Sequence, residues 1–101
     1  MNREIIFGRF RGDAKTYRSE NGRYYFKLNF IDQGDYFDIY CTYHPSFNGQ
    51  DSNPHKTHLY RSGKICFAEG HEPKTQKRAE ELAAQWAEYF LEYRKTGIAQ
   101  S

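Results

Sequence analysis

The sequence predicts an α+β fold in which an antiparallel β-meander packs on one long C-terminal helix. In the first two-thirds of the chain, apolar and polar residues alternate between turn signals, and after Pro73 the apolar residues recur at helical spacing. The 101 residues are enough for a single domain with one modest core, predicted to span residues 1–101. Only 38% of the residues are hydrophobic and 18% are aromatic, so tyrosine and phenylalanine must build much of that core.

The meander is predicted as three strands separated by turns. A short apolar run over residues 4–10 is followed by turn residues at Gly12-Asp13 and at 19–22, where the Asn-Gly pair suits a tight hairpin. Further strands are predicted at 23–31 and 36–43, with a turn at 33–35. Their core-facing residues are expected to be Tyr24, Phe26, Leu28 and Phe30 on the first, and Phe37, Ile39, Cys41 and Tyr43 on the second.

The remainder of the chain is predicted as a loop, two short extended segments and the helix. Residues 44–55 are rich in Pro, Gly, Asn and Ser, which favours a surface loop. Extended segments are expected at 57–60 and 64–67, with a turn at 61–63 between them. The helix is predicted from Lys74 or Thr75 to about Lys95, with Thr75 as N-cap and Gly97 as its stop. Its apolar stripe comprises Ala79, Leu82, Ala83, Trp86, Phe90 and Leu91.

Charge and terminal composition restrict the class of protein. The net charge is +2, and the charged residues are scattered without a long run of one sign, which predicts no nucleic-acid partner. The N-terminus lacks the apolar stretch of a signal peptide, and no segment approaches the roughly 18 apolar residues of a membrane span. We therefore expect a cytoplasmic protein with no membrane partner, in which both cysteines are reduced thiols.

The two cysteines are expected to point in different directions: Cys41 is in phase with the apolar residues of its strand, and Cys66 is out of phase with those of its own. Because Ile65 and Phe67 are large and apolar, alternation turns Cys66 to the outer face, which is unusual for a structural cysteine. Lys64 and the histidine-rich loop before it are expected to favour the thiolate. Cys41 lies on the apolar parity of its strand and is interpreted as a small core residue. The pattern thus predicts that Cys66 is a working thiol.

The segment 59–67, Leu-Tyr-Arg-Ser-Gly-Lys-Ile-Cys-Phe, resembles the active-site stretch of ubiquitin-conjugating (E2) enzymes. That stretch has a His-Pro-Asn triplet, an aliphatic residue, a short turn with Gly, and then Ile/Val-Cys-Leu. When Gly63 and Cys66 are matched, the family's Asn falls on His58. The order of meander, Pro-containing loop, acidic loop and helix is also similar, so the resemblance spans most of the chain and implies a minimal UBC-like core.

The chain departs from the family at several points. Lys56-Thr57-His58 replaces the triplet, the loop is shorter, and there is no room for the family's N-terminal helix or its last two helices. Such a reduced core is most similar to the E2-like proteins of bacterial ubiquitin-like conjugation operons, including those of antiphage defence.

The resemblance implies an activity and its partners. Cys66 would accept a ubiquitin-like protein as a thioester from an E1-like enzyme and pass it to an amine of a target, without a cofactor. His58 would either donate an imidazole N–H to the oxyanion, as an Asn amide does in the relatives, or act as a base. His71 and Glu69 are further base candidates without motif support. The spacing of the histidines and cysteines does not match paired zinc ligands, so no metal is expected.

Two other functions remain open from the sequence. One is a non-catalytic E2-variant module that binds ubiquitin-like proteins, although such variants lack the nucleophilic cysteine. The other is a small nucleic-acid-binding domain using Tyr24, Phe26 and Phe30 as a stacking face. The helix needs that face as its core contact, which favours a structural role for the three rings.

Overall fold

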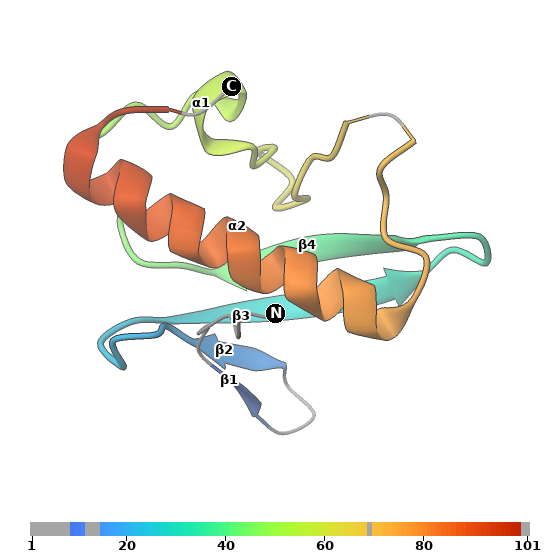
Figure 1. Ribbon diagram of the computed structural model, residues 1–101. Helices are drawn as coiled ribbons and strands as arrows, with labels where there is room; N and C mark the ends of the chain where they lie inside the picture. The colour runs from blue at the N-terminus through green and yellow to red at the C-terminus, as the bar shows by residue number, and fades with distance from the viewer. Residues whose placement is uncertain (1–8, 12–14, 69, 100–101) are drawn as a thin grey trace.

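The computed structural model describes residues 9–11, 15–68 and 70–99. Strands β1 (Arg9–Arg11), β2 (Thr16–Arg18), β3 (Tyr25–Asp32) and β4 (Phe37–Tyr43) form one antiparallel sheet in the order of the chain. The long helix α2 (Gln76–Thr96) lies across one face of this sheet, and the single-turn helix α1 (Pro54–Thr57) follows the loop after β4 (Figure 1). This arrangement confirms the predicted α+β meander with one long C-terminal helix. The sheet has four strands where three were predicted, because β2, of three residues, was not predicted.

The hairpin between β2 and β3 forms at the predicted Asn-Gly turn. Gly22 has a φ of 75°, and the Ser19 N–H donates to the Tyr24 carbonyl at 2.8 Å. Strand β3 begins two residues later than predicted, and β4 begins one residue later. The predicted turn at Gly12-Asp13 and most of the predicted strand at 4–10 lie outside the described residues.

A β-bulge in β4 corrects the prediction that Tyr43 faces the core. Cys41 pairs with Leu28, but Tyr43 pairs with the adjacent Lys27, so Thr42 is an extra residue in the ladder. The insertion shifts the parity of the strand and turns Tyr43 to the outer face, where it is 42% exposed. Its ring stacks on Tyr25 at a centroid distance of 4.7 Å.

Helix α2 follows the predicted bounds to within two residues. The Thr75 hydroxyl accepts the Arg78 N–H at 3.1 Å, and Gly97 adopts the left-handed conformation with a φ of 74°. In the described part of the chain, neither helix combines the length and the apolar run that crossing a bilayer requires. The helix buries Ala79, Ala83, Ala84, Trp86, Ala87, Phe90 and Tyr93, with Leu82 and Leu91 half-buried beside them.

Aromatic rings join the helix to the sheet. Phe26 of β3 is fully buried and meets Trp86 and Phe90 edge-on, at centroid distances of 5.7 and 5.6 Å. The Trp86 indole also donates from Nε1 to the Thr57 carbonyl at 2.9 Å. One core side chain therefore binds both the sheet and the end of α1.

The prediction of an uninterrupted loop over residues 44–55, followed by a strand at 57–60, is wrong around α1. Asn53 caps this helix by accepting the His55 N–H at 2.8 Å, and Pro54 occupies its first position, where the missing N–H costs nothing. The expected strands at 57–60 and 64–67 reduce to two isolated bridges, Leu59 with Ile65 and Tyr40 with Lys64. Because α1 extends to Thr57, few residues remain before the turn at 60–63 to pair with residues 64–67.

We expect Trp86→Ala to lower the free energy of unfolding by about 3–5 kcal/mol, because it opens a cavity between helix and sheet. Urea unfolding at matched conditions measures this change. Trp86→Phe is the control, since it keeps a ring in the core and loses the indole N–H, and it should cost about 1–3 kcal/mol for the unpaired Thr57 carbonyl. Unchanged stability in Trp86→Ala would contradict the core role and indicate that this face of α2 meets a partner.

Candidate active site

Cys66 lies just beyond a segment that extends the sheet next to β4. The Cys41 N–H donates to the Gly63 carbonyl at 2.7 Å, and the Ile65 N–H donates to the Ile39 carbonyl at 2.8 Å. These bonds fix Ile65 in the core, where it is almost completely buried. The next side chain, that of Cys66, is half-buried and lines a surface pocket together with residues of α2.

Gly63 allows this segment to approach β4 closely. It ends the turn at 60–63 with a φ of 94°, and a Cβ at this position would lie 2.9 Å from the Cys41 carbonyl oxygen. The Gly63 N–H donates to the Tyr60 carbonyl at 2.9 Å, and the Tyr60 N–H donates to the Lys64 carbonyl at 2.8 Å. Gly63 therefore has a backbone role that a larger residue would disturb.

His58 returns close to Cys66 and is joined to it through main chain and side chain. The His58 carbonyl accepts the Cys66 N–H at 2.9 Å, and His58 Nδ1 lies 4.0 Å from Cys66 Sγ. His58 adopts the left-handed conformation, with a φ of 57°, at the C-terminus of α1. Because the Cys66 N–H is used in this bond, it does not serve as a backbone donor to a substrate carbonyl.

Two side chains of α2 hold the residues that precede His58 in place. The Trp86 indole donates to the Thr57 carbonyl, and the Tyr89 hydroxyl donates to the Lys56 carbonyl. The Tyr89 ring also packs against the His58 ring at a centroid distance of 5.4 Å. The imidazole is thus positioned from the helix. Sequence analysis missed Tyr89: three-residue spacing places it on the same side of the helix as Trp86 but gives no sign of what that side contacts.

A surface pocket of about 290 Å³ surrounds the thiol and the imidazole. Gln85 is another polar side chain of its lining: it is exposed on α2, and its amide has no hydrogen bond to another described residue, unlike the Trp86 indole and the Tyr89 hydroxyl. Sequence analysis missed Gln85 as well, because nothing in the helical spacing relates it to Cys66. The pocket is lined by His58, Ile65, Cys66, Phe67, Leu82, Gln85, Trp86 and Tyr89.

The electrostatic environment of Cys66 differs from the sequence expectation. Partial burial raises the pKa of the Cys66 thiol, and a backbone hydrogen bond opposes this effect only in part. The Lys64 ammonium, expected to favour the thiolate, instead pairs with Asp38 at 3.4 Å. The prediction of a thiolate-favouring environment is therefore wrong. At neutral pH Cys66 is a thiol, and a reaction at its sulfur needs a base.

Among the described residues, the other candidates His71 and Cys41 do not line this pocket. His71 is exposed and outside the pocket lining, and Glu69 lies outside the described residues. Cys41 is a core residue, as predicted: its thiol donates to the Tyr43 carbonyl at 3.1 Å, and burial raises its pKa to about 12. Among the residues that the structure describes, no group of three or more His, Cys, Asp or Glu side chains could hold a metal ion.

We expect iodoacetamide to modify Cys66 in the native protein and to leave Cys41 unmodified until the protein is unfolded. The Cys66 rate should keep rising above pH 9, because a raised thiol pKa moves thiolate formation above the ordinary value of 9.0. Mass spectrometry of the alkylated peptides across pH measures both sites. A Cys66 rate that levels off at neutral pH would contradict the raised pKa, and Cys66→Ala is the control for labelling at Cys41.

No protein-family model, curated protein or solved structure matches this chain significantly.

Proposed function

We propose that this protein is an E2-like conjugating enzyme that carries a ubiquitin-like protein as a thioester on Cys66. The observation that supports the proposal most directly is the pairing of Cys66 Sγ with His58 Nδ1 at 4.0 Å in a pocket open to the surface. The E2-like motif of residues 58–66 supplies the class of reaction. The same resemblance suggests a cytoplasmic setting in a bacterial conjugation or antiphage system.

Loading is a thiol–thioester exchange. The Cys66 sulfur attacks the carbonyl carbon of the thioester on the E1-like enzyme, and the bond from that carbon to the E1 sulfur breaks. The E1 thiolate leaves and takes up a proton, while the Cys66 proton passes to a base. The raised pKa of Cys66 makes this base necessary at neutral pH. His58 is the nearest candidate in the described part of the chain.

Transfer breaks the new carbon–sulfur bond. An amine nitrogen of the target attacks the carbonyl carbon, negative charge develops on the carbonyl oxygen, and Cys66 leaves and is reprotonated as the nitrogen loses a proton. An oxyanion needs a hydrogen-bond donor, and the Cys66 N–H already donates to the His58 carbonyl. Trp86 and Tyr89 also line the pocket, but both already donate to backbone carbonyls. His58 and Gln85 are therefore the side chains that could supply the donor.

The raised thiol pKa suits a carrier. A thiol of higher pKa is a poorer leaving group, so its thioester is attacked more slowly until catalytic groups and an acceptor are in place. The half-buried sulfur also lies within a partly apolar pocket. A non-catalytic E2-variant role would leave this thiol and its imidazole partner without a use.

Reconstitution tests the proposal. The protein is incubated with the E1-like enzyme of its own operon, the corresponding ubiquitin-like protein and ATP, and the products are separated on a gel without reductant. An adduct that disappears after reductant treatment is expected. A synthetic peptide α-thioester provides a second, enzyme-free donor, because transfer to Cys66 needs no nucleotide. Failure of both donors to modify Cys66 would reject the proposed function.

A further inference from the structure

Helix α2 covers one face of the sheet (Figure 1). The other face of β3 and β4 carries exposed side chains. We call this second side the outer face. Its aromatic and aliphatic members are unusually open: Tyr25 is 37% exposed, Tyr43 42% and Ile31 43%. The outward residues on β2, β3 and β4 are Thr16, Arg18, Tyr25, Lys27, Asn29, Ile31, Asp38, Tyr40 and Tyr43.

Two tyrosines of the outer face form a stacked aromatic pair, which we call the Tyr25–Tyr43 platform and whose outer ring faces are open to a further ring. The Tyr25 and Tyr43 rings are stacked at a centroid distance of 4.7 Å and an interplanar angle of 19°. Both rings are exposed and neither belongs to the core, which lies on the other side of the sheet and contains Phe26 and Phe90. Exposed rings on an antiparallel sheet are the surface on which unpaired bases stack.

Unpaired cations lie beside this platform. Arg18 is the register partner of Tyr25, and Lys27 is the register partner of Tyr43. Neither Lys27 nor Arg18 forms an ion pair with any residue in the described ranges. The one acidic residue at an outward position of β2, β3 and β4 is Asp38, which is buried and paired with Lys64.

The chain's net charge of +2 does not show how its charges are distributed. Helix α2, on the opposite side of the sheet, carries four acidic and four basic residues, so its own charges balance. On the outer face, Arg18 and Lys27 have no ion-pair partner in the described ranges. The fold leaves the outer face with an excess of positive charge, which complements a polyanion.

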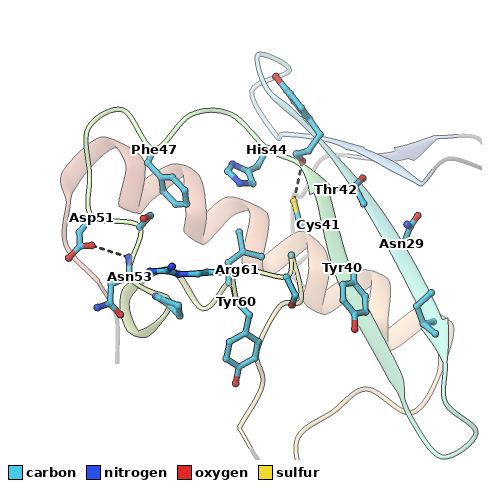
Figure 2. Close-up of a pocket in the computed structure, with 17 residues that line it drawn as sticks. Asn29, Tyr40, Cys41, Thr42, His44, Phe47, Asp51, Asn53, Tyr60 and Arg61 are labelled. Atoms are coloured by element: carbon cyan, nitrogen blue, oxygen red, sulfur yellow. Dashed lines mark hydrogen bonds between the residues drawn. The ribbon is translucent and has the colours of Figure 1, made fainter.

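A groove continues the outer face from Tyr43 toward the turn at 60–63. It has a volume of about 1010 Å³ and lies between β3, β4, the loop that precedes α1 and the 60–63 turn (Figure 2). Tyr60 at its rim is 49% exposed, and Figure 2 shows Arg61 extending along it toward Asn53. The one carboxylate of its lining, Asp51, is paired with Lys56 at 3.3 Å. Like the Tyr25–Tyr43 platform, the groove therefore combines an exposed ring, Tyr60, with a cation, Arg61, that has no ion pair in the described ranges.

We propose that the outer face binds single-stranded nucleic acid. Bases stack on the Tyr25–Tyr43 platform, and phosphates pair with Lys27, Arg18 and, farther along the groove, Arg61. This surface is distinct from the aromatic face weighed in the sequence, because Phe26 is fully buried under α2. It also differs from the Cys66 pocket, with which its groove shares no lining residue.

Fluorescence anisotropy with labelled oligo(dT) and oligo(U) tests the proposal at low and moderate salt. Wild-type protein should bind both, with an affinity that falls as salt rises. Tyr43→Ala should weaken binding about tenfold or more, and Tyr43→Phe, which keeps the stacking ring, should bind nearly as wild type. Lys27→Gln should reduce the slope of log affinity against log salt by about one. Lys77→Gln on the exposed side of α2 is the matched charge control and should leave binding unchanged.

Several outcomes would overturn the proposal. These are no binding at low salt, equal binding by Tyr43→Ala, equal binding of duplex DNA, or an equal loss in Lys77→Gln. Preferential binding of polyglutamate would assign the face to an acidic protein partner instead. Because Tyr43 is exposed, its variants should fold, and circular dichroism checks this. Cys66→Ala should bind oligonucleotides as wild type does, which separates this test from that of the thioester.

Discussion

Cys66→Ala should abolish the reductant-sensitive adduct with the ubiquitin-like protein, whereas Cys41→Ala should retain it. The two thiols differ in access: Cys66 opens into the surface pocket beside His58, and Cys41 is buried with its thiol bonded to the Tyr43 carbonyl. Burial raises the pKa of Cys41 to about 12, so this residue offers almost no thiolate at neutral pH. Only Cys66 combines access with a neighbouring base.

Cys66→Ser sharpens the assignment. A serine at this position would form an oxygen ester, which resists thiol reductants but is cleaved by mild base, so the chemistry of the adduct identifies the atom that carries it. Circular dichroism and urea unfolding of Cys41→Ala establish that any loss is not a loss of fold. An adduct that persists in Cys66→Ala, or that requires Cys41, would reject Cys66 as the nucleophile.

The elements that the sequence predicts well are those whose signals are local. Thr75 and Gly97 mark the two ends of α2, and alternation along β3 identifies Phe26 and Leu28 as core residues. The burial of Ile65 beside Cys66 also follows from its residue type. Each of these inferences needs only spacing and residue type.

The features that the sequence does not predict depend on contacts between distant segments. Tyr43 faces outward because the pairing of β4 with β3 contains a bulge. Lys64 forms an ion pair with Asp38, which is distant from it in the sequence. The support of His58 by Tyr89 joins residues 31 positions apart. Solvent exclusion around Cys66, which raises its pKa, is likewise a property of the assembled pocket. No local pattern contains this information.

For His58 we expect a large effect on transfer and a smaller one on loading. Removing the imidazole should slow discharge of a preformed thioester to free lysine by about a hundred- to a thousand-fold, as loss of one oxyanion donor typically does. Thioester formation should persist, because the E1-like enzyme can contribute groups to that step. Single-turnover discharge of preloaded protein, followed across pH, measures the effect.

The backbone of His58 determines which variants are informative. Its φ of 57° is costly for alanine, by about 1–2 kcal/mol, but acceptable for asparagine and glycine. His58→Gly is therefore the side-chain deletion that keeps the α1 turn, and comparison with His58→Ala reveals any contribution from backbone strain. Gln85→Ala is measured beside the His58 variants, because the Gln85 side-chain amide is a second possible donor in the pocket.

His58→Asn separates the two roles of the imidazole. If His58 donates a hydrogen bond to the oxyanion, asparagine supplies an equivalent amide and should recover much of the rate. If His58 is a general base, His58→Asn should stay slow, and the wild-type rate should rise through the pH range in which imidazoles titrate. A loss in Gln85→Ala with normal rates in all His58 variants would move the donor role to α2. Equal rates in every variant would leave His58 with a structural role at the end of α1.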